Sequence, residues 1–286
     1  MTDIDIEHLK QWEGGEQIEE DVVDAWTARA LAAVLDWPSP PEPGDALPPL
    51  WHWLYFLPAA RQSELGEDGH ARRGGFLPPV PLPRRMWASG SVEWPAPLRV
   101  GDAARRVSTV RSVTHKKGRS GELVFTVVGH AIHNEAGVAV REEQNLVYRD
   151  APGPDAPPPK VIEPPAAADF GRDMTADPVL LFRYSALTFN GHRIHYDLDF
   201  ATRVEGYDDL VVHGPLLATL LLDLARHEGG VAEGLARYEY RAVRPLLANR
   251  PFKLQGRRTD GGLELWVVDD EGAVAMKAMA TLGAES

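Results

Sequence analysis

The chain has 286 residues, 44% of them apolar and 25% charged, which is a soluble globular composition long enough for one large domain or two small ones. It contains no cysteine and carries a net charge of −12, so disulfides, thiolate nucleophiles, cysteine-bound metals and nucleic-acid partners are disfavoured. No apolar run approaches the roughly 18 residues of a membrane span, and the first residues lack signal-peptide features, which predicts a cytoplasmic protein without membrane association.

The first third of the chain predicts one helix followed by irregular segments. Apolar residues at helical spacing predict an amphipathic helix over Glu20–Trp37, ended by the proline-rich segment that follows. Acidic residues 19–21 lie where the positive end of that helix would favour them. An aromatic run, Leu50–Phe56, comes next, and residues 66–85 are rich in Gly, Arg and Pro, which is typical of a loop.

Strands are predicted from there to residue 149. Alternating and β-branched runs cover Arg105–Thr114, Leu123–Ile132 and Val138–Tyr148, with turn residues between them. Residues 151–168 are rich in Pro and Ala, which predicts a semi-rigid linker. We therefore expect an N-terminal domain over 1–150 and a C-terminal domain over 169–286.

The second half repeats the plan of the first. Val179–Thr188 has the pattern of a strand, and Pro215–Arg226 that of a helix that is apolar nearly all round and therefore buried. Further strands are expected at Ala236–Val243, Phe252–Arg258, Leu263–Val268 and Val274–Leu282. A buried helix wrapped by antiparallel strands, present twice, predicts an α+β protein with a double hot-dog fold. An ordinary α+β domain is the alternative.

Reactive side chains gather in one stretch of the second half. The motifs of P-loop NTPases, dinucleotide-binding enzymes, serine esterases and zincins are absent, which leaves ordinary acid–base side chains to do the chemistry. The densest set comprises Tyr184, His192, His195, Asp197 and His213. Such residues at the junction of a regular element and a loop are typical of a site, although histidines can also be plain polar groups in a turn.

This stretch resembles the hydratase-2 motif of MaoC-like (R)-specific enoyl-CoA hydratases, G-D-x-N-P-[LIV]-H-x5-[AS]. Ile194, His195 and Ala201 match its second half. Asn190 stands at the motif's aspartate position, and His192-Arg193 replace Asn-Pro. The departure resembles the fused two-hot-dog branch of the family, which includes 3-methylfumaryl-CoA (mesaconyl-C4-CoA) hydratase, itaconyl-CoA hydratase and the mitochondrial 3-hydroxyacyl-thioester dehydratase.

The first half resembles the N-terminal, dehydratase-like domain of the same branch. The similar segments are Leu65–His70, Arg73–Val80, Leu82–Trp87, Gly118–Gly121 and Arg141–Gln144. The resemblance implies a hydro-lyase that adds or removes water across the double bond of an acyl-CoA, with the first half serving as the substrate-tunnel half. It implies a branched C5 dicarboxylic substrate, 3-methylfumaryl-CoA or itaconyl-CoA. No cofactor or metal is expected beyond the CoA of the substrate.

Three residues are candidates for the hydration chemistry. His195 suits the base that activates water, because the pKa of histidine lies near neutrality. Gly214 precedes Pro215 at the start of the buried helix, where its N–H could stabilise the enolate oxygen. Asn190 cannot take a proton, so we expect it to orient the water.

The proton donor is open at this stage. His192, Asp197 or Tyr184 could supply it, or His195 could act alone as base and then acid; His213 is a further supporting candidate. The single-histidine version is the hypothesis that we carry forward.

Three arginines are candidates for binding the substrate: Arg84, Arg85 and Arg193. A free carboxylate on the acyl chain needs a cation, and a guanidinium binds carboxylates in bidentate fashion. A solvated surface role is the alternative for each arginine. The competing functions are a fatty-acid (R)-3-hydroxyacyl-thioester dehydratase, a hot-dog thioesterase and a non-catalytic acyl-CoA-binding module. A homodimer is possible.

Overall fold

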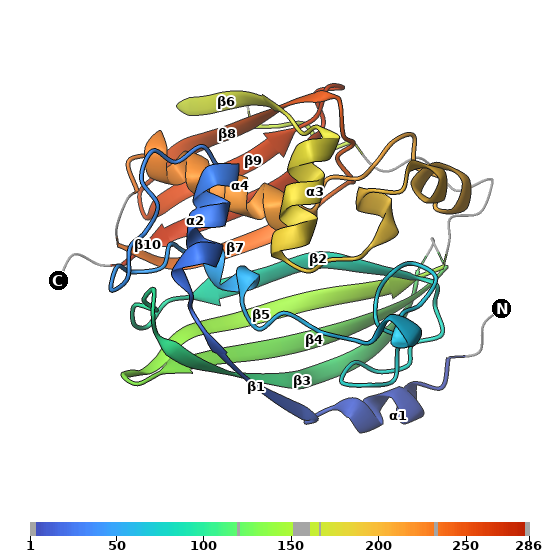
Figure 1. The fold of residues 1–286 in the computed structure, drawn as a ribbon. Helices are drawn as coiled ribbons and strands as arrows, with labels where there is room; N and C mark the ends of the chain where they lie inside the picture. The colour runs from blue at the N-terminus through green and yellow to red at the C-terminus, as the bar shows by residue number, and fades with distance from the viewer. Residues whose placement is uncertain (1–3, 119–120, 151–160, 166, 232–233, 284–286) are drawn as a thin grey trace.

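The computed structural model describes residues 4–118, 121–150, 161–165, 167–231 and 234–283. Ten antiparallel strands in these residues form one sheet, in the order β1-β3-β4-β5-β2-β7-β10-β9-β8-β6 (Figure 1). The first five are β1 (Glu16–Val22), β2 (Arg84–Glu93), β3 (Ala103–Gly118), β4 (Gly121–Asn134) and β5 (Gly137–Arg149). The other five are β6 (Phe170–Thr175), β7 (Leu235–Ala242), β8 (Pro251–Thr259), β9 (Gly262–Val268) and β10 (Val274–Leu282).

The two halves of the sheet have the same strand order. Read from the outer edges inward, the first half runs β1-β3-β4-β5-β2 and the second runs β6-β8-β9-β10-β7. They join where β2 pairs with β7, from Ser89 opposite Arg241 to Glu93 opposite Arg237. The predicted repeat is therefore present as two five-stranded units that share one continuous sheet. The predicted domain boundaries stay a prediction.

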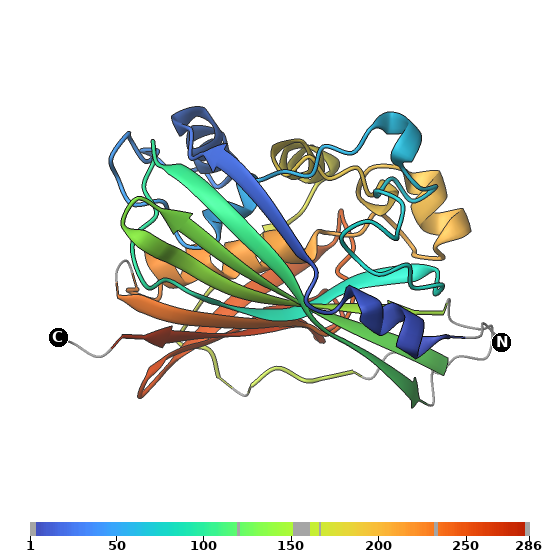
Figure 2. The same ribbon diagram turned by 90° about the horizontal axis from the view of Figure 1, so that it is seen from below.

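Helices lie on one face of this curved sheet. Figure 2 shows α2 (Ala25–Val34), α3 (Pro178–Leu187) and α4 (Gly214–His227) on the same side. The remaining α-helix is α1 (Ile6–Leu9), and 3-10 turns occur at Lys10–Trp12, Trp51–Leu54, Gln62–Glu64 and Arg193–His195. A π-helical turn covers Phe200–Val204.

The central helix α4 is buried, as predicted from its sequence. Every residue from Leu216 to Ala225 is buried, and the helix packs on β8, β9 and β10. Its one buried charge, Asp223, is paired with Arg172 (2.8 Å) and accepts a hydrogen bond from the indole of Trp37 (2.6 Å). Pairing of this kind removes much of the cost of burying a carboxylate. The arrangement is the double hot-dog expected from the sequence.

The N-terminal helix is shorter than predicted, and acidic residues 19–21 are not in it. They belong to the edge strand β1, where Glu19 pairs with Arg106 on β3 (2.6 Å). The helix α2 begins only after Asp24, whose carboxylate accepts the N–H of Thr27 as an N-cap. The cross-strand ion pair stabilises residues 19–21 in β1, and the N-cap at Asp24 sets the start of α2 later than predicted.

The predicted strand at Val179–Thr188 was wrong. These residues form α3, with Asp177 as N-cap and Pro178 in the first turn. Its buried residues are Leu181, Tyr184 and Ser185, which share one helical face. A short apolar run does not distinguish a strand from a buried helix. The strand of this region, β6, lies just before it and was not predicted.

The other predicted strands and the helix at Pro215–Arg226 are confirmed with small changes at their ends. Most of the predicted linker, residues 151–160 and 166, lies outside the described residues. Of the remainder, Ile162 accepts the N–H of Val274 and packs with Trp266. Among the described helices, none is long and apolar enough to cross a membrane.

Candidate active site

The reactive cluster lies between the end of α3 and the first turn of α4. There the His195 ring stacks on the ring of His213, the residue that precedes α4, with centroids 3.6 Å apart. The His192 ring meets His195 edge-on, with centroids 5.4 Å apart. The sequence places these three histidines in two segments, and the fold brings their rings into contact in the order His192, His195, His213, a series that we call the histidine row.

His195 is held in one orientation and one protonation state. Its Nδ1 lies 2.6 Å from the carbonyl oxygen of Val211, so that nitrogen carries the proton and donates it. The other ring nitrogen, Nε2, then carries the lone pair. Burial lowers the pKa of His195 to about 4, so the ring is neutral at physiological pH and can accept a proton.

His213 supports His195 from behind. It is 1% exposed, its Nε2 hydrogen-bonds with Ser185 Oγ at 2.8 Å, and the Tyr184 ring lies edge-on to it at 5.1 Å. Burial, with the two neighbouring histidines, holds the pKa of His213 well below its usual value. A neutral ring at this place keeps positive charge away from His195.

The first half of the chain completes the row of rings. The His70 ring lies 4.2 Å from the His192 ring, and its Nδ1 is 2.9 Å from the carboxylate of Asp68. The hydrogen bond to His70 overcomes burial and leaves the pKa of Asp68 below its usual value, whereas burial leaves the pKa of His70 lowered. Asp68 thus orients His70 toward the second-half cluster.

A close approach of two loops fixes this contact between the halves. Arg193 donates its backbone N–H to the carbonyl of Asp68 (3.0 Å). Gly69, with a φ of +88°, lies so close to Gly191 that a Cβ on Gly69 would fall 1.9 Å from the Gly191 carbonyl oxygen. Only glycine allows both this backbone conformation and this approach.

Asp68, His70 and His192 are also the group of potential metal ligands found in the described residues. Their ligand atoms all lie within 4.8 Å of one another. The hydrogen bond between Asp68 and His70 and the ring contact between His70 and His192 account for this closeness. The expectation that the enzyme uses no metal or cofactor stays a prediction.

Gly214 is the first residue of α4 and lies against the ring of Trp87. As the first residue of the helix, its N–H has no acceptor within the helix. A Cβ on Gly214 would fall 2.8 Å from the Trp87 ring of β2. The N–H therefore lies at the positive end of a buried helix, beside His213 and facing an indole from the first half. This is suitable for stabilising a developing oxyanion.

The other candidates from the second half differ in how far their side chains are already engaged within the protein. The side-chain oxygen of Asn190 accepts the N–H of His192 (3.0 Å), which leaves its NH₂ group as a donor. Asp197 is bound to Arg193 (2.7 Å) and accepts the N–H of Phe200 (3.0 Å), so it stabilises the loop. Tyr184 is fully buried, and burial raises its pKa. These contacts disfavour Asp197 and Tyr184 as proton donors.

The three candidate arginines also differ. Arg193 pairs with Asp197, donates to the Glu67 carbonyl and lies over the Phe200 ring. Arg84 pairs with Glu205 at 3.1 Å. Arg85, which follows Arg84 in the sequence, forms no ion pair with a carboxylate in the described part of the chain.

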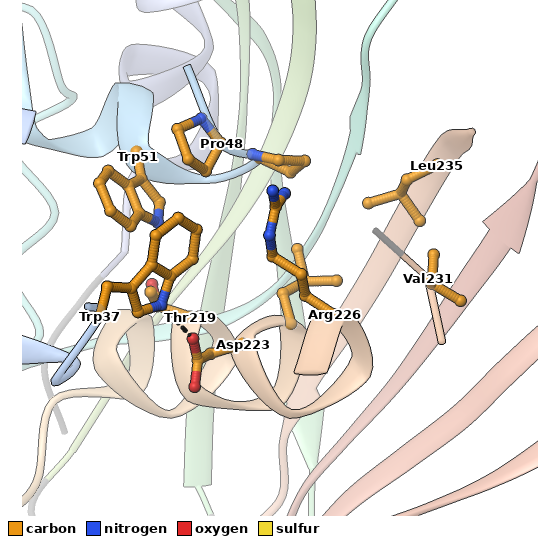
Figure 3. Close-up of a pocket in the computed structure, with 10 residues that line it drawn as sticks. Trp37, Pro48, Trp51, Thr219, Asp223, Arg226, Val231 and Leu235 are labelled. Carbon is orange, nitrogen blue, oxygen red and sulfur yellow. Dashed lines mark hydrogen bonds between the residues drawn. The ribbon is translucent and has the colours of Figure 1, made fainter. Parts of the chain in front are cut away.

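The pocket drawn in Figure 3 is separate from this cluster. It lies along the middle and end of α4, between Trp37, Trp51 and Arg226. Its volume is about 30 Å³, which suffices for about one water molecule. It contains none of the four histidines, and we assign it no part in binding an acyl chain.

The residues that sequence reasoning left without a role are Asp68, His70 and Trp87. Each lay in a segment that resembled the family, but their position opposite the second-half histidines depends on how the halves pack. Together the cluster offers a fixed neutral base at His195, a helix N–H at Gly214 and a second histidine held by a carboxylate. Such a set can add water to, or remove it from, a polarised double bond.

Comparison with known proteins identifies the family of this chain. The sequence profile of the family "Hydroxyacyl-thioester dehydratase type 2" matches residues 50–248. The chain belongs to this family. It is also 47% identical over 270 residues to "Mesaconyl-C(4)-CoA hydratase" of Chloroflexus aurantiacus, covering 94% of this chain and 95% of that relative.

Solved structures show the same fold. A MaoC-like dehydratase from Phytophthora capsici superposes with a TM-score of 0.67 at 15% identity, covering 99% of this chain and 100% of that one. A Mycobacterium tuberculosis protein described as having a double hot-dog fold gives 0.54 at 15% identity, over 94% and 96% of the two chains. The predicted family, fold class and enzyme class are thereby confirmed: the protein is a hydro-lyase of the hydratase/dehydratase type.

Proposed function

We propose that this enzyme hydrates the double bond of mesaconyl-C4-CoA, or removes water from the corresponding hydroxyacyl-CoA. The observation that carries the proposal is the neutral, oriented His195 beside the Gly214 N–H at the start of α4. The 47% identity to mesaconyl-C(4)-CoA hydratase over nearly the whole chain supports this substrate. Itaconyl-CoA is the second substrate that the sequence suggests.

The reaction begins with His195. Its Nε2 takes a proton from water while the water oxygen bonds to the β-carbon of the acyl group. The π electrons move toward the thioester, whose carbonyl oxygen becomes an enolate oxygen. The hydrogen bond from Nδ1 to the Val211 carbonyl (2.6 Å) holds the ring in place and stabilises the imidazolium that forms.

Gly214 stabilises the negative charge that develops. Its N–H donates to the enolate oxygen, and the dipole of the buried helix α4 adds to the effect. One such donor typically lowers the barrier by about 3 kcal/mol. Trp87 packs against Gly214 and limits water at this position.

His195 then returns the proton. The imidazolium gives its Nε2 proton to the α-carbon, the enolate collapses to the thioester, and the ring is neutral again. Burial lowers the pKa of His195 to about 4, which makes the transient imidazolium a strong donor toward carbon. The side-chain oxygen of Asn190 is engaged by the His192 N–H, and its NH₂ group is the donor that orients the water.

One assay panel tests this proposal. The purified enzyme is offered mesaconyl-C4-CoA, itaconyl-CoA and crotonyl-CoA, with loss of the enoyl-thioester and release of free thiol followed in parallel. We expect hydration without thiol release, fastest with mesaconyl-C4-CoA. Thiol release without hydration would indicate a thioesterase, and binding without either reaction a non-catalytic module; both results contradict the proposal.

A further inference from the structure

Arg85 differs from the two other arginines that the sequence suggested for substrate binding. Arg84 and Arg193 both have carboxylate partners within the protein, Glu205 and Asp197. Arg85 is half-buried and has no such partner among the described residues. We infer that Arg85 binds a free carboxylate on the acyl group of the substrate, an inference that rests on the function proposed above.

The position of Arg85 places its charge at the site. It lies near the beginning of β2, opposite Tyr148 of β5 in the sheet register. Its positive charge adds to burial in lowering the pKa of His70 and of His192. It also opposes the rise that burial causes in the pKa of Tyr148. Trp87 lies two positions farther along β2, on the same face of the strand as Arg85, and packs against Gly214. Arg85 therefore extends from the face of β2 that meets the catalytic cluster.

The charge around Arg85 is not balanced by the protein. Arg73 is a second cation nearby, and it donates to the backbone carbonyls of Val80 and Pro83. The carboxylate in this region is Asp68, which is bound to His70. Burial keeps the histidines neutral. Arg85 is thus a half-buried cation with no carboxylate of the described residues to neutralise it, and an anionic ligand stabilises such a cation.

The order of groups along the row fits a dicarboxylic acyl thioester. His70 and His192 lie at the Arg85 end, His195 follows, and His213 with Gly214 lies at the other end. In mesaconyl-C4-CoA the free carboxylate, the double bond and the thioester follow one another in the same order. We therefore assign the acyl group an orientation with its carboxylate on Arg85, its double bond at His195 and its thioester oxygen toward Gly214.

The inference also explains how an acidic protein takes an anionic acyl group. The chain carries a net charge of −12, which repels an anion at long range. A local excess of positive charge at Arg85 and Arg73 counters that repulsion at the site. A monocarboxylic acyl group, which has no such carboxylate, leaves Arg85 without an anionic partner.

The test compares two substrates across four variants. The ratio of kcat/KM for mesaconyl-C4-CoA to that for crotonyl-CoA is measured for the wild type, Arg85→Met, Arg85→Lys, Arg84→Met and the control Arg111→Met. Arg111 is an exposed arginine on β3. Truncating one partner of a buried charge pair typically costs about 30-fold or more, so we expect R85M to lower the ratio by that factor.

The other variants should keep a higher ratio than R85M. R85K should lower the ratio less than R85M, because lysine keeps the charge but loses the bidentate geometry. R111M should leave the ratio unchanged. A ratio in R85M equal to that of the wild type overturns the inference, and so does a collapse of the ratio in Arg84→Met instead.

A binding measurement keeps the inference testable if catalysis fails. Titration calorimetry with freshly prepared succinyl-CoA and with butyryl-CoA measures how much the free carboxylate adds to affinity. We expect the wild type to prefer succinyl-CoA and R85M to lose that preference while retaining the wild-type melting temperature. Wild-type enzyme that hydrates neither mesaconyl-C4-CoA nor crotonyl-CoA contradicts the proposed function alone; equal preference for succinyl-CoA in wild type and R85M contradicts the role of Arg85 alone.

Discussion

At the scale of single residues, the site depends on one glycine that cannot be enlarged. A Cβ on Gly214 would fall 2.8 Å from the Trp87 ring, so in Gly214→Ala either the indole or the first turn of α4 must shift. We predict a fall in kcat of about 100-fold, the effect typical of a displacement of about 1 Å in a catalytic group. Steady-state kinetics measure it.

Gly261→Ala is the matched control for Gly214→Ala. Gly261 lies in the turn between β8 and β9, and a Cβ there meets no atom within 4 Å. This variant should keep wild-type kinetics. Equal activity in G214A and G261A would show that the N–H of residue 214 tolerates displacement, and Gly214 would lose its role.

The sequence predicted only part of the site at this scale. His195 and Gly214 were found because each lies in a local pattern, a histidine motif and a glycine-proline helix start. Asp68, His70 and Trp87 belong to the other half and touch the second-half residues only through packing of the halves. A contact between residues more than a hundred positions apart leaves no local pattern in one sequence.

At the scale of elements, a buried carboxylate joins β5 to the aromatic turn before β2. Glu142 on β5 bonds to the His52 ring (3.1 Å), the Trp53 indole (2.9 Å) and the Gln144 amide (2.7 Å). These hydrogen bonds overcome burial and lower the pKa of Glu142 to about 2. The charge is thus fully committed to holding the turn against the sheet.

Removing that carboxylate should destabilise the fold. Glu142→Ala leaves one buried donor, His52, and two partly buried donors, Trp53 and Gln144, without a partner, for which we predict a loss of about 3–5 kcal/mol in the free energy of unfolding. Urea unfolding measures it. The control Glu143→Ala removes the exposed neighbour on the same strand and should change stability by less than about 0.5 kcal/mol. Similar midpoints for the two variants would rule out a structural role for the network.

Elements with a clear apolar period were predictable from the sequence, whereas elements whose conformation depends on contacts with other parts of the chain were not. The strands β3, β4, β5 and the helix α4 follow directly from their apolar patterns. The end of the edge strand β1 was taken for the start of a helix, because the cation that pairs with Glu19, Arg106, lies far away in the sequence on β3. The helix α3 was taken for a strand, because ten residues with few polar positions fit both periods.

At the scale of the whole molecule, burial of neutral histidines in both halves makes stability depend on pH. Burial lowers the pKa of His130 in the first half and His195 in the second from 6.5 to about 4, and lowers those of His192 and His213 as well. Between these values the unfolded chain binds more protons than the folded protein. The free energy of unfolding therefore falls as pH decreases through this range.

We predict full stability above about pH 7 and a progressive loss from about pH 6.5 toward pH 4. Urea unfolding at a series of pH values measures the slope. His130→Asn removes one titrating group far from the catalytic cluster and should make the slope shallower. A free energy of unfolding that stays constant from pH 7 to pH 5 would contradict the neutral state assigned to these histidines.

The most direct test of this account is His195→Ala assayed on mesaconyl-C4-CoA, with the hydrated thioester quantified by mass spectrometry. The exposed His8 supplies the control His8→Ala. Because one acid–base group typically contributes about 10²–10⁴-fold, we predict a loss of that size in H195A, wild-type activity in H8A and folded protein in both. H195A that keeps more than about a tenth of wild-type turnover would contradict the central claim that His195 moves the proton.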